Sequence, residues 1–160
     1  MIIKLKHINK IDVYEFCLRC QDKYEDWYIT KNKSRLMIDN LFLIEEILKH
    51  QEIYGLFEKE LQGILLIYRS KGFRPYLKVL AKTDKYLIDL LKWFRWNFNE
   101  VDMYLKCKKD NPLSKKILKT GFVLIGNRGK ELLFFKKGIK QLFHIIPKDN
   151  YLKDNEKRLF

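Results

Sequence analysis

The chain has 160 residues, which suits one domain with one hydrophobic core. Hydrophobic residues make up 47% of it and aromatic residues 14%, a composition that excludes an intrinsically disordered chain although 33% of the residues are charged. No stretch approaches the ~20 uncharged apolar residues that a membrane helix requires, and Met1–Lys4 has the pattern of a strand rather than of a signal peptide. We therefore expect a soluble cytoplasmic protein without a membrane partner.

The formal net charge of +13 arises from 33 Lys and Arg against 20 Asp and Glu. Such a charge indicates nucleic acid, an anionic surface or an anionic cofactor as a partner. Genome composition offers another explanation, because alanine occurs once, at Ala81, while Lys, Ile, Leu, Phe, Tyr and Asn are abundant. The charge is therefore a weak indication of function.

The three cysteines match neither a disulfide framework nor a metal site. A structural zinc site needs four ligands, usually with a second Cys or His pair nearby, and the three histidines are scattered singly. We therefore expect reduced thiols, in the core or at the surface, and no metal site. The cysteines are Cys17, Cys20 and Cys107.

The first third of the chain predicts a strand and two helices. Asn9 is suited to cap the first helix, and Ser34 or Asn32 the second, because short polar side chains accept hydrogen bonds from the first-turn amides. Apolar residues recur at helical spacing after each of these caps. The expected elements are a strand over 2–5, a helix over 10–28 and a helix over 34–50.

In the remainder of the chain, segments with the periodicity of a strand alternate with segments that have the periodicity of a helix. Short β-rich segments separated by the polar turn 58–60 predict a hairpin. Asp84 is suited to cap a strongly apolar helix that follows a strand. The expected elements are strands over 53–57, 61–68 and 76–80, a helix over 84–98, a strand over 101–107, a helix over 111–120, and strands over 122–125 and 131–135. This order predicts an α/β fold with a mixed, mostly antiparallel sheet flanked by helices.

The chain end differs from the rest, so we divide the sequence into a domain over 1–138 and an extension over 139–160. Residues 139–146 are apolar enough to pack, whereas the segment from Pro147 onward is polar until Leu159 and Phe160. A docking tail and a frayed terminus both fit this pattern.

The segment DNPLSKKILKTGFVLIG, residues 110–126, has the features of a short helix between two strands. Asp110 or Asn111 can cap it, and Pro112 stands in the first turn, where a missing N–H costs no hydrogen bond. Gly121 allows a left-handed stop before the next strand.

This order of elements over residues 1 to 137 resembles the GNAT fold of acyl-CoA N-acyltransferases. In that family an Asn near the start of a short helix follows a strand, and the helix ends in Gly-Phe before the next strand. Asn111, Gly121 and Phe122 match these positions. The resemblance implies a cleft for acetyl-CoA between two strands of the central sheet.

The sequence departs from the family where the pyrophosphate of coenzyme A would bind. GNAT enzymes typically place a Gly-rich loop before the central helix, and here no glycine occurs between Gly72 and Gly121. Asp84 would also place a negative charge at the helix N-terminus, which Lys82 and Lys85 offset in part. If acetyl-CoA binds, the resemblance assigns it to Lys82, Thr83, Lys85 and Asn111.

The catalytic groups of the family are also missing. Many members carry a Tyr as general acid in the last helix, and the matching register here holds Ile117 or Leu118, which cannot donate a proton. Strand 76–80 has no carboxylate or imidazole, which leaves Glu52 and Glu58 on the preceding hairpin as candidate bases. Both are better explained as exposed strand carboxylates, so we assign no catalytic residue.

A narrower resemblance accommodates these departures. Small GNAT-like proteins in the structural gene modules of short-tailed bacteriophages share the Asn, the short helix and Leu-Lys-Thr followed by Gly, here residues 118–121. This resemblance implies a role in virion assembly, with other particle proteins as partners and no acyl transfer. The location would then be the host cytoplasm or the virion.

Three functional hypotheses follow from the sequence. The first is a noncatalytic GNAT-fold binding or assembly protein, in a phage particle, that needs no cofactor. The second is an N-acetyltransferase that holds acetyl-CoA on an atypical loop, because positioning alone can carry much of such a transfer. The third is a nucleic-acid-binding protein that uses the densest basic cluster, made of Lys106, Lys108, Lys109, Lys115, Lys116 and Lys119.

Overall fold

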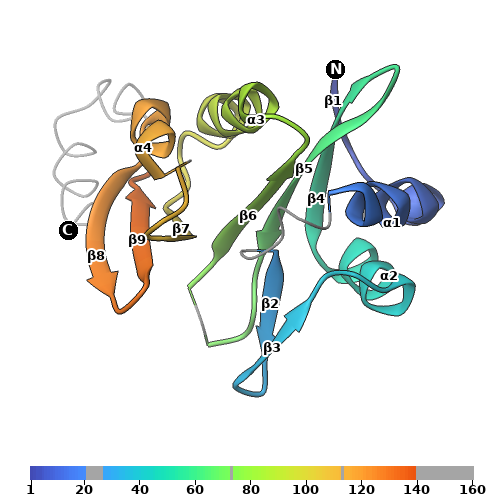
Figure 1. The fold of residues 1–160 in the computed structure, drawn as a ribbon, viewed down its shortest axis with the longest axis horizontal. Coiled ribbons are helices and arrows are strands. Elements are labelled where there is room, and N and C mark those ends of the chain that lie inside the picture. Colours follow the sequence, from blue (N-terminus) through green and yellow to red (C-terminus); the bar gives the residue numbers. More distant parts are fainter. Residues whose placement is uncertain (21–26, 73, 113, 140–160) are drawn as a thin grey trace, which may run out of the picture.

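A computed structural model describes residues 1–20, 27–72, 74–112 and 114–139, and its center is a mixed sheet with helices on both faces (Figure 1). The expected α/β architecture is confirmed. In the described part of the chain, none of the helices is long and apolar enough to cross a membrane. Residues 140–160, which include nearly all of the expected extension, lie outside the described residues.

Seven strands form the main sheet, in the order β1-β4-β5-β6-β7-β9-β8. Among these described strands β6 and β7 are the parallel neighbors, and every other neighboring pair is antiparallel. The strands are β1 (Ile2–Lys4), β4 (Glu52–Glu58), β5 (Glu60–Tyr68), β6 (Tyr76–Ala81), β7 (Met103–Lys108), β8 (Val123–Arg128) and β9 (Glu131–Lys136). Neighboring strands of this sheet therefore alternate in direction everywhere except between β6 and β7, which run the same way.

The helices divide between the two faces of the sheet. Helices α1 (Lys10–Arg19) and α2 (Leu41–His50) pack on one face, and α3 (Asp84–Asn97) and α4 (Ser114–Ile117) pack on the other. Successive side chains of a strand point to opposite faces of the sheet, so one strand contributes to both hydrophobic cores. On β5, Leu66 packs in the core beneath α1 and α2, and its neighbor Leu65 packs in the core beneath α3. All three cysteines are buried and none is in a disulfide, so of the two placements that the sequence allows the structure shows the core.

The expected helix over 34–50 is wrong in its first part. Strands β2 (Tyr28–Lys31) and β3 (Ser34–Met37) form a hairpin instead. Its two turn residues, Asn32 and Lys33, have φ values of 52° and 66°, as tight hairpin turns require. Neither Asn32 nor Ser34 caps a helix, because α2 begins after Asn40, whose side chain accepts from the Leu43 amide at 2.9 Å.

The expected helix over 10–28 is too long. Helix α1 ends at Arg19, and Tyr28 is already in strand β2. Asn9 is the N-cap residue of α1 as predicted, but its side chain makes no capping hydrogen bond and instead accepts from the amide of Lys6 at 2.9 Å, on the preceding turn.

The segment after β7 folds as the sequence predicts but with a shorter helix. Helix α4 spans Ser114–Ile117, and a 3-10 turn over Leu118–Thr120 continues it. Gly121 then has φ of 96°, which confirms the left-handed stop. Thr120 is buried, and its hydroxyl donates to the carbonyl of Ile117 at 2.6 Å.

Gly121→Ala tests this stop. A Cβ at Gly121 would sit at positive φ and only 2.8 Å from the side chain of Arg95, so we expect a loss of about 1–2 kcal/mol in unfolding free energy. Urea denaturation measures it. Gly126→Ala is the matched control, since its nearest neighbor atom would be 3.8 Å away and its φ is not left-handed. Equal stability of Gly121→Ala and the parent would contradict the assignment.

Candidate functional site

Strands β6 and β7 part after a short ladder. They pair only through Tyr76 with Tyr104 and Leu77 with Leu105. Beyond these pairs β6 stays with β5 as far as Ala81, and β7 stays with β9 as far as Lys108. The sheet therefore opens in the middle, between two strands that each remain held on their outer side.

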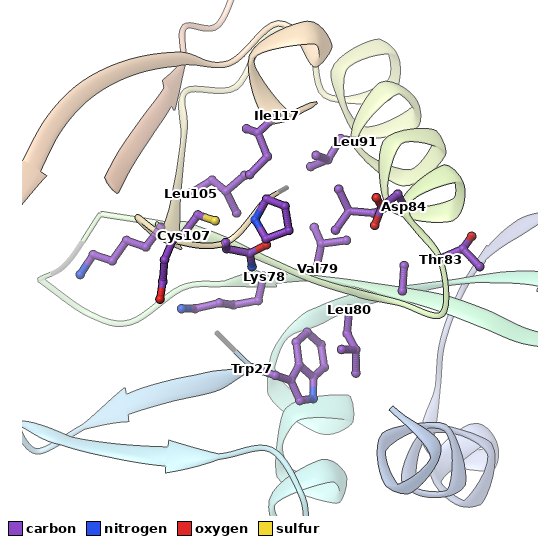
Figure 2. Close-up of a pocket in the computed structure, with 16 residues that line it drawn as sticks. Trp27, Lys78, Val79, Leu80, Thr83, Asp84, Leu91, Leu105, Cys107 and Ile117 are labelled. Carbon is purple, nitrogen blue, oxygen red and sulfur yellow. The ribbon is translucent and has the colours of Figure 1, made fainter. Parts of the chain in front are cut away.

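A cleft of about 350 Å³ occupies this opening (Figure 2). Its walls are mainly apolar and come from both strands, from α3 and from the α4 region. The wall residues are Val79, Leu80, Ala81, Leu87, Leu91, Leu105, Cys107, Pro112 and Ile117, and the polar or amphipathic lining comes from Trp27, Lys78, Thr83, Asp84, Lys106, Asp110 and Asn111.

The N-terminus of α3 closes one end of the cleft. Thr83, rather than the predicted Asp84, is the cap residue, and its hydroxyl accepts from the Tyr86 amide at 3.4 Å. Asp84 and Lys85 are the first two helical residues, and amides at these positions have no acceptor within the helix. The positive end of the helix dipole therefore meets the cleft.

Asp84 is paired with a lysine from the other side of the cleft. Its carboxylate accepts from the ammonium group of Lys116 on α4, and both side chains are about half exposed. The pair offsets the negative charge that the sequence places at this helix end. It also ties α4 to the start of α3.

The four residues predicted to bind acetyl-CoA are only partly brought together. Thr83 and Asn111 line the cleft. Lys82 and Lys85 are exposed beside it and are not among the lining residues. Lys82 lies 4.0 Å from Glu60, and the Lys85 ammonium lies 5.9 Å from the Tyr86 ring centroid.

The predicted basic cluster divides between the two faces of the sheet. Lys106 and Lys108 alternate along β7 with Leu105 and Cys107, which pack in the core beneath α3. Their side chains therefore leave from the opposite face. The other cluster members are Lys109, in the turn after β7, Lys115 and Lys116 on α4, and Lys119 in the 3-10 turn that follows α4.

The two candidate bases lie outside the cleft lining and make structural contacts. Glu52 accepts from the hydroxyl of Tyr54 at 2.7 Å and from Arg69 at 2.8 Å. Partial burial acts to raise the pKa of Glu52, but these hydrogen bonds and the nearby charges of Arg69 and Lys4 together outweigh it, and the pKa is lowered. Glu58 accepts from the hydroxyl of Tyr86 at 2.7 Å. Neither carboxylate is placed to take a proton in the cleft.

Sequence reasoning did not identify Lys78 and Trp27 as site residues. Lys78 is only 6% exposed, and its ammonium lies 4.0 Å from the ring centroid of Tyr28 on the hairpin. Trp27 is 2% exposed, and nothing among the described residues accepts from its indole N–H. A lysine inside the apolar strand YLKVLA was the available signal for Lys78. Trp27 offered no such signal.

No family model matches the sequence, and no curated protein matches it either. Solved structures do. An N-acetyltransferase from Staphylococcus aureus superimposes with a TM-score of 0.63 at 16% identity, over 86% of this chain and 96% of that one. The protein has the GNAT fold. A spermidine N-acetyltransferase from Vibrio cholerae gives 0.60 at 10% identity, over 86% and 94% of the two chains.

A third similar structure is a ribosomal-protein α-N-acetyltransferase in complex with coenzyme A, with a TM-score of 0.63 at 10% identity over 86% of this chain and 93% of that one. The expected resemblance in fold is thereby confirmed for this chain. At sequence identities this low, the similarity shows the GNAT fold alone and does not identify a substrate for this protein.

The Glu52–Tyr54 contact predicts an unusual alkaline titration. Burial first, and then the hydrogen bond to Glu52, raises the pKa of Tyr54 to about 12. Because this folded-state pKa lies above the ordinary value of 10, the associated stability is present below pH 10 and is lost as the pH rises toward 12. The absorbance difference between the parent and Tyr54→Phe should show a phenolate step near pH 12. Glu52→Gln should move that step down, and a step near pH 10 in the difference between the parent and Tyr54→Phe would contradict the contact.

Proposed function

We propose that the protein binds an acyl-coenzyme A in the cleft between β6 and β7 and transfers the acyl group to an amine. The observation that carries the proposal is the opening of the sheet after two ladder pairs, which creates an apolar cleft ending at a helix N-terminus. The similar solved structures named above are all acetyltransferases.

The cleft suits the long, uncharged arm of such a ligand. Val79 and Leu105 line it from the two parted strands, and Leu91 lines it from α3. A ligand cavity of a few hundred Å³ with mainly apolar walls is typical of small-molecule sites. Bound acyl-coenzyme A would supply an acyl group activated as a thioester.

The start of α3 suits the anionic end of the ligand. The amides of Asp84 and Lys85 and the helix dipole attract anions, and Lys82 and Lys85 add positive charge nearby. Pairing with Lys116 reduces the repulsion that Asp84 would exert. In this proposal, the cationic side chains bind the phosphates that backbone amides bind in a Gly-rich loop.

Proton transfer is the weak part of this site, so we expect slow turnover. Ile117 is buried in the cleft wall, where it cannot donate a proton. A positioned general acid or base contributes typically ~10²–10⁴ in rate. The rate would then depend mainly on holding the two reactants together.

A noncatalytic binding protein, including a phage assembly protein, is the second candidate. The apolar Ile117 and the Asp84–Lys116 pair favor it, because both stand where an active enzyme would place functional groups. In this case the cleft would hold a ligand or a partner without turnover.

Calorimetric titration with acetyl-CoA tests binding, and Val79→Trp supplies the blocking variant. An indole at Val79 fills the cleft, so we expect micromolar binding by the parent and at least a tenfold loss in the variant. Val123→Trp is the matched control, since Val123 is 55% exposed on β8 and does not line the cleft. Binding that survives Val79→Trp would place the ligand elsewhere. Binding without any acyl transfer to amines would favor the second candidate.

Lys85→Glu tests the anionic end separately. The charge reversal should weaken acetyl-CoA binding about tenfold while leaving acetylpantetheine, which has no phosphates, unchanged. Lys92→Glu on the same helix is the control, because it is exposed two turns away from the N-terminus. Equal losses for both ligands would show that Lys85 acts through the fold instead.

A further inference from the structure

An aromatic row crosses three strands on the face of the sheet opposite α3. Tyr76, Tyr104 and Phe135 are register partners on β6, β7 and β9. Their ring centroids are 6.1 Å and 4.9 Å apart. Val123 on β8 is the next register partner and is 55% exposed. The aromatic row thus ends at Phe135, and the exposed apolar side chain of Val123 continues it to the edge of the sheet.

This aromatic row is not part of either core. Tyr76, Tyr104 and Phe135 are half-buried, and none of them packs in the two buried clusters. On β5 the row continues as Tyr68, which does pack on the first core and whose hydroxyl donates to Thr30 of the hairpin at 3.4 Å. Within the described part of the chain, cover on this face thus reaches Tyr68 and stops short of the three rings.

Cationic side chains border the aromatic row. The Arg74 guanidinium lies 5.1 Å from the Tyr104 ring centroid and donates to the Tyr104 hydroxyl at 2.8 Å. The ammonium group of Lys106 lies 4.7 Å from the centroid of Tyr76. These two cations therefore lie over the ring faces, so a base that stacks there displaces them toward its own phosphates.

A basic hollow lies at the far end of the same face. Lys108, Glu131 and Arg128 are register partners across β7, β9 and β8. Arg35 reaches Glu131 from the hairpin, and Tyr28 donates to the same carboxylate at 3.3 Å. The lining, as far as the described residues show, is four cations and one carboxylate: Arg35, Lys108, Arg128, Lys130 and Glu131.

We infer that this open face binds single-stranded nucleic acid, with bases on the aromatic row and phosphates at the bordering cations. Exposed aromatic rings give stacking platforms that accept any base, and cations alongside track the backbone. Charge complementarity favors this occupant, because Glu131 is the one carboxylate that the described residues place in the hollow, and it is already bonded to Arg35 and Tyr28. In a duplex the bases are stacked on one another and could not use the rings.

Fluorescence anisotropy with the full chain and labeled oligo(dT) or oligo(rU) tests this inference. We expect binding of both at low salt and weaker competition by a duplex of equal length. Tyr104→Leu should lower the affinity at least fivefold, because stacking on an aromatic ring is lost while an apolar side chain remains. Circular dichroism and the acetyl-CoA titration check that this variant is folded.

A charge-matched pair of double variants separates the open face from general basicity. Arg128→Gln with Lys130→Gln should lower the affinity about tenfold and reduce the slope of log affinity against log salt by about 1.4, as expected for two lost phosphate contacts to a single strand. Lys115→Gln with Lys119→Gln removes the same charge from the α4 region, where both lysines are exposed, and should change the affinity less than twofold.

Three results would overturn the inference. The first is no binding of either oligonucleotide at low salt. The second is equal weakening by the two double variants, which would show attraction by net charge alone. The third is full affinity in Tyr104→Leu together with equal binding of duplex, which would leave no role for the aromatic row.

Discussion

The parting of β6 from β7 is the constraint on which the rest of this structure depends. Each strand keeps its outer neighbor, so the ladders with β5 and β9 continue where the central one stops. Backbone groups on the inner edges then need other partners, such as solvent or a ligand. The helix that follows β6 directs its N-terminus to the same opening, which joins an apolar cleft to an anion-attracting end.

The charged side chains of the protein lie on several separate parts of its surface. The Asp84–Lys116 pair joins α3 to α4, while Lys106 and Lys108 leave from the opposite face of the sheet. The residues that give the net charge of +13 are therefore not gathered in a single basic patch. Lys106 also lines the cleft, so the cleft and the open sheet face adjoin at this residue.

Much of the fold could be predicted from periodicity, whereas the hairpin over 28–37 could not. The strands over 53–68 and the helix at 84–98 have strong local patterns that match β4, β5 and α3. Leu36 and Met37 continue the helical spacing of α2, so a local pattern extends that helix too far. The turn that prevents it uses Asn32 and Lys33 at positive φ, and Lys is a residue that gives little sign of such a turn.

The site was less accessible to sequence reasoning than the fold. Thr83 and Asn111, which line the cleft, could be predicted only from the resemblance in fold. Lys78 and Trp27 reach it only through tertiary packing, since the hairpin brings Tyr28 over Lys78. The separation of β6 from β7 depends on how each strand pairs with distant parts of the chain, and a local sequence pattern cannot predict it.

Hydrogen–deuterium exchange with and without saturating acetyl-CoA tests the central claim most directly. Slower exchange should be confined to residues 78–81 of β6, residues 105–107 of β7 and the first turn of α3, while the amides of β8 and β9 exchange at unchanged rates. Protection spread evenly over the chain, or none at all at millimolar ligand, would contradict a binding cleft between the parted strands.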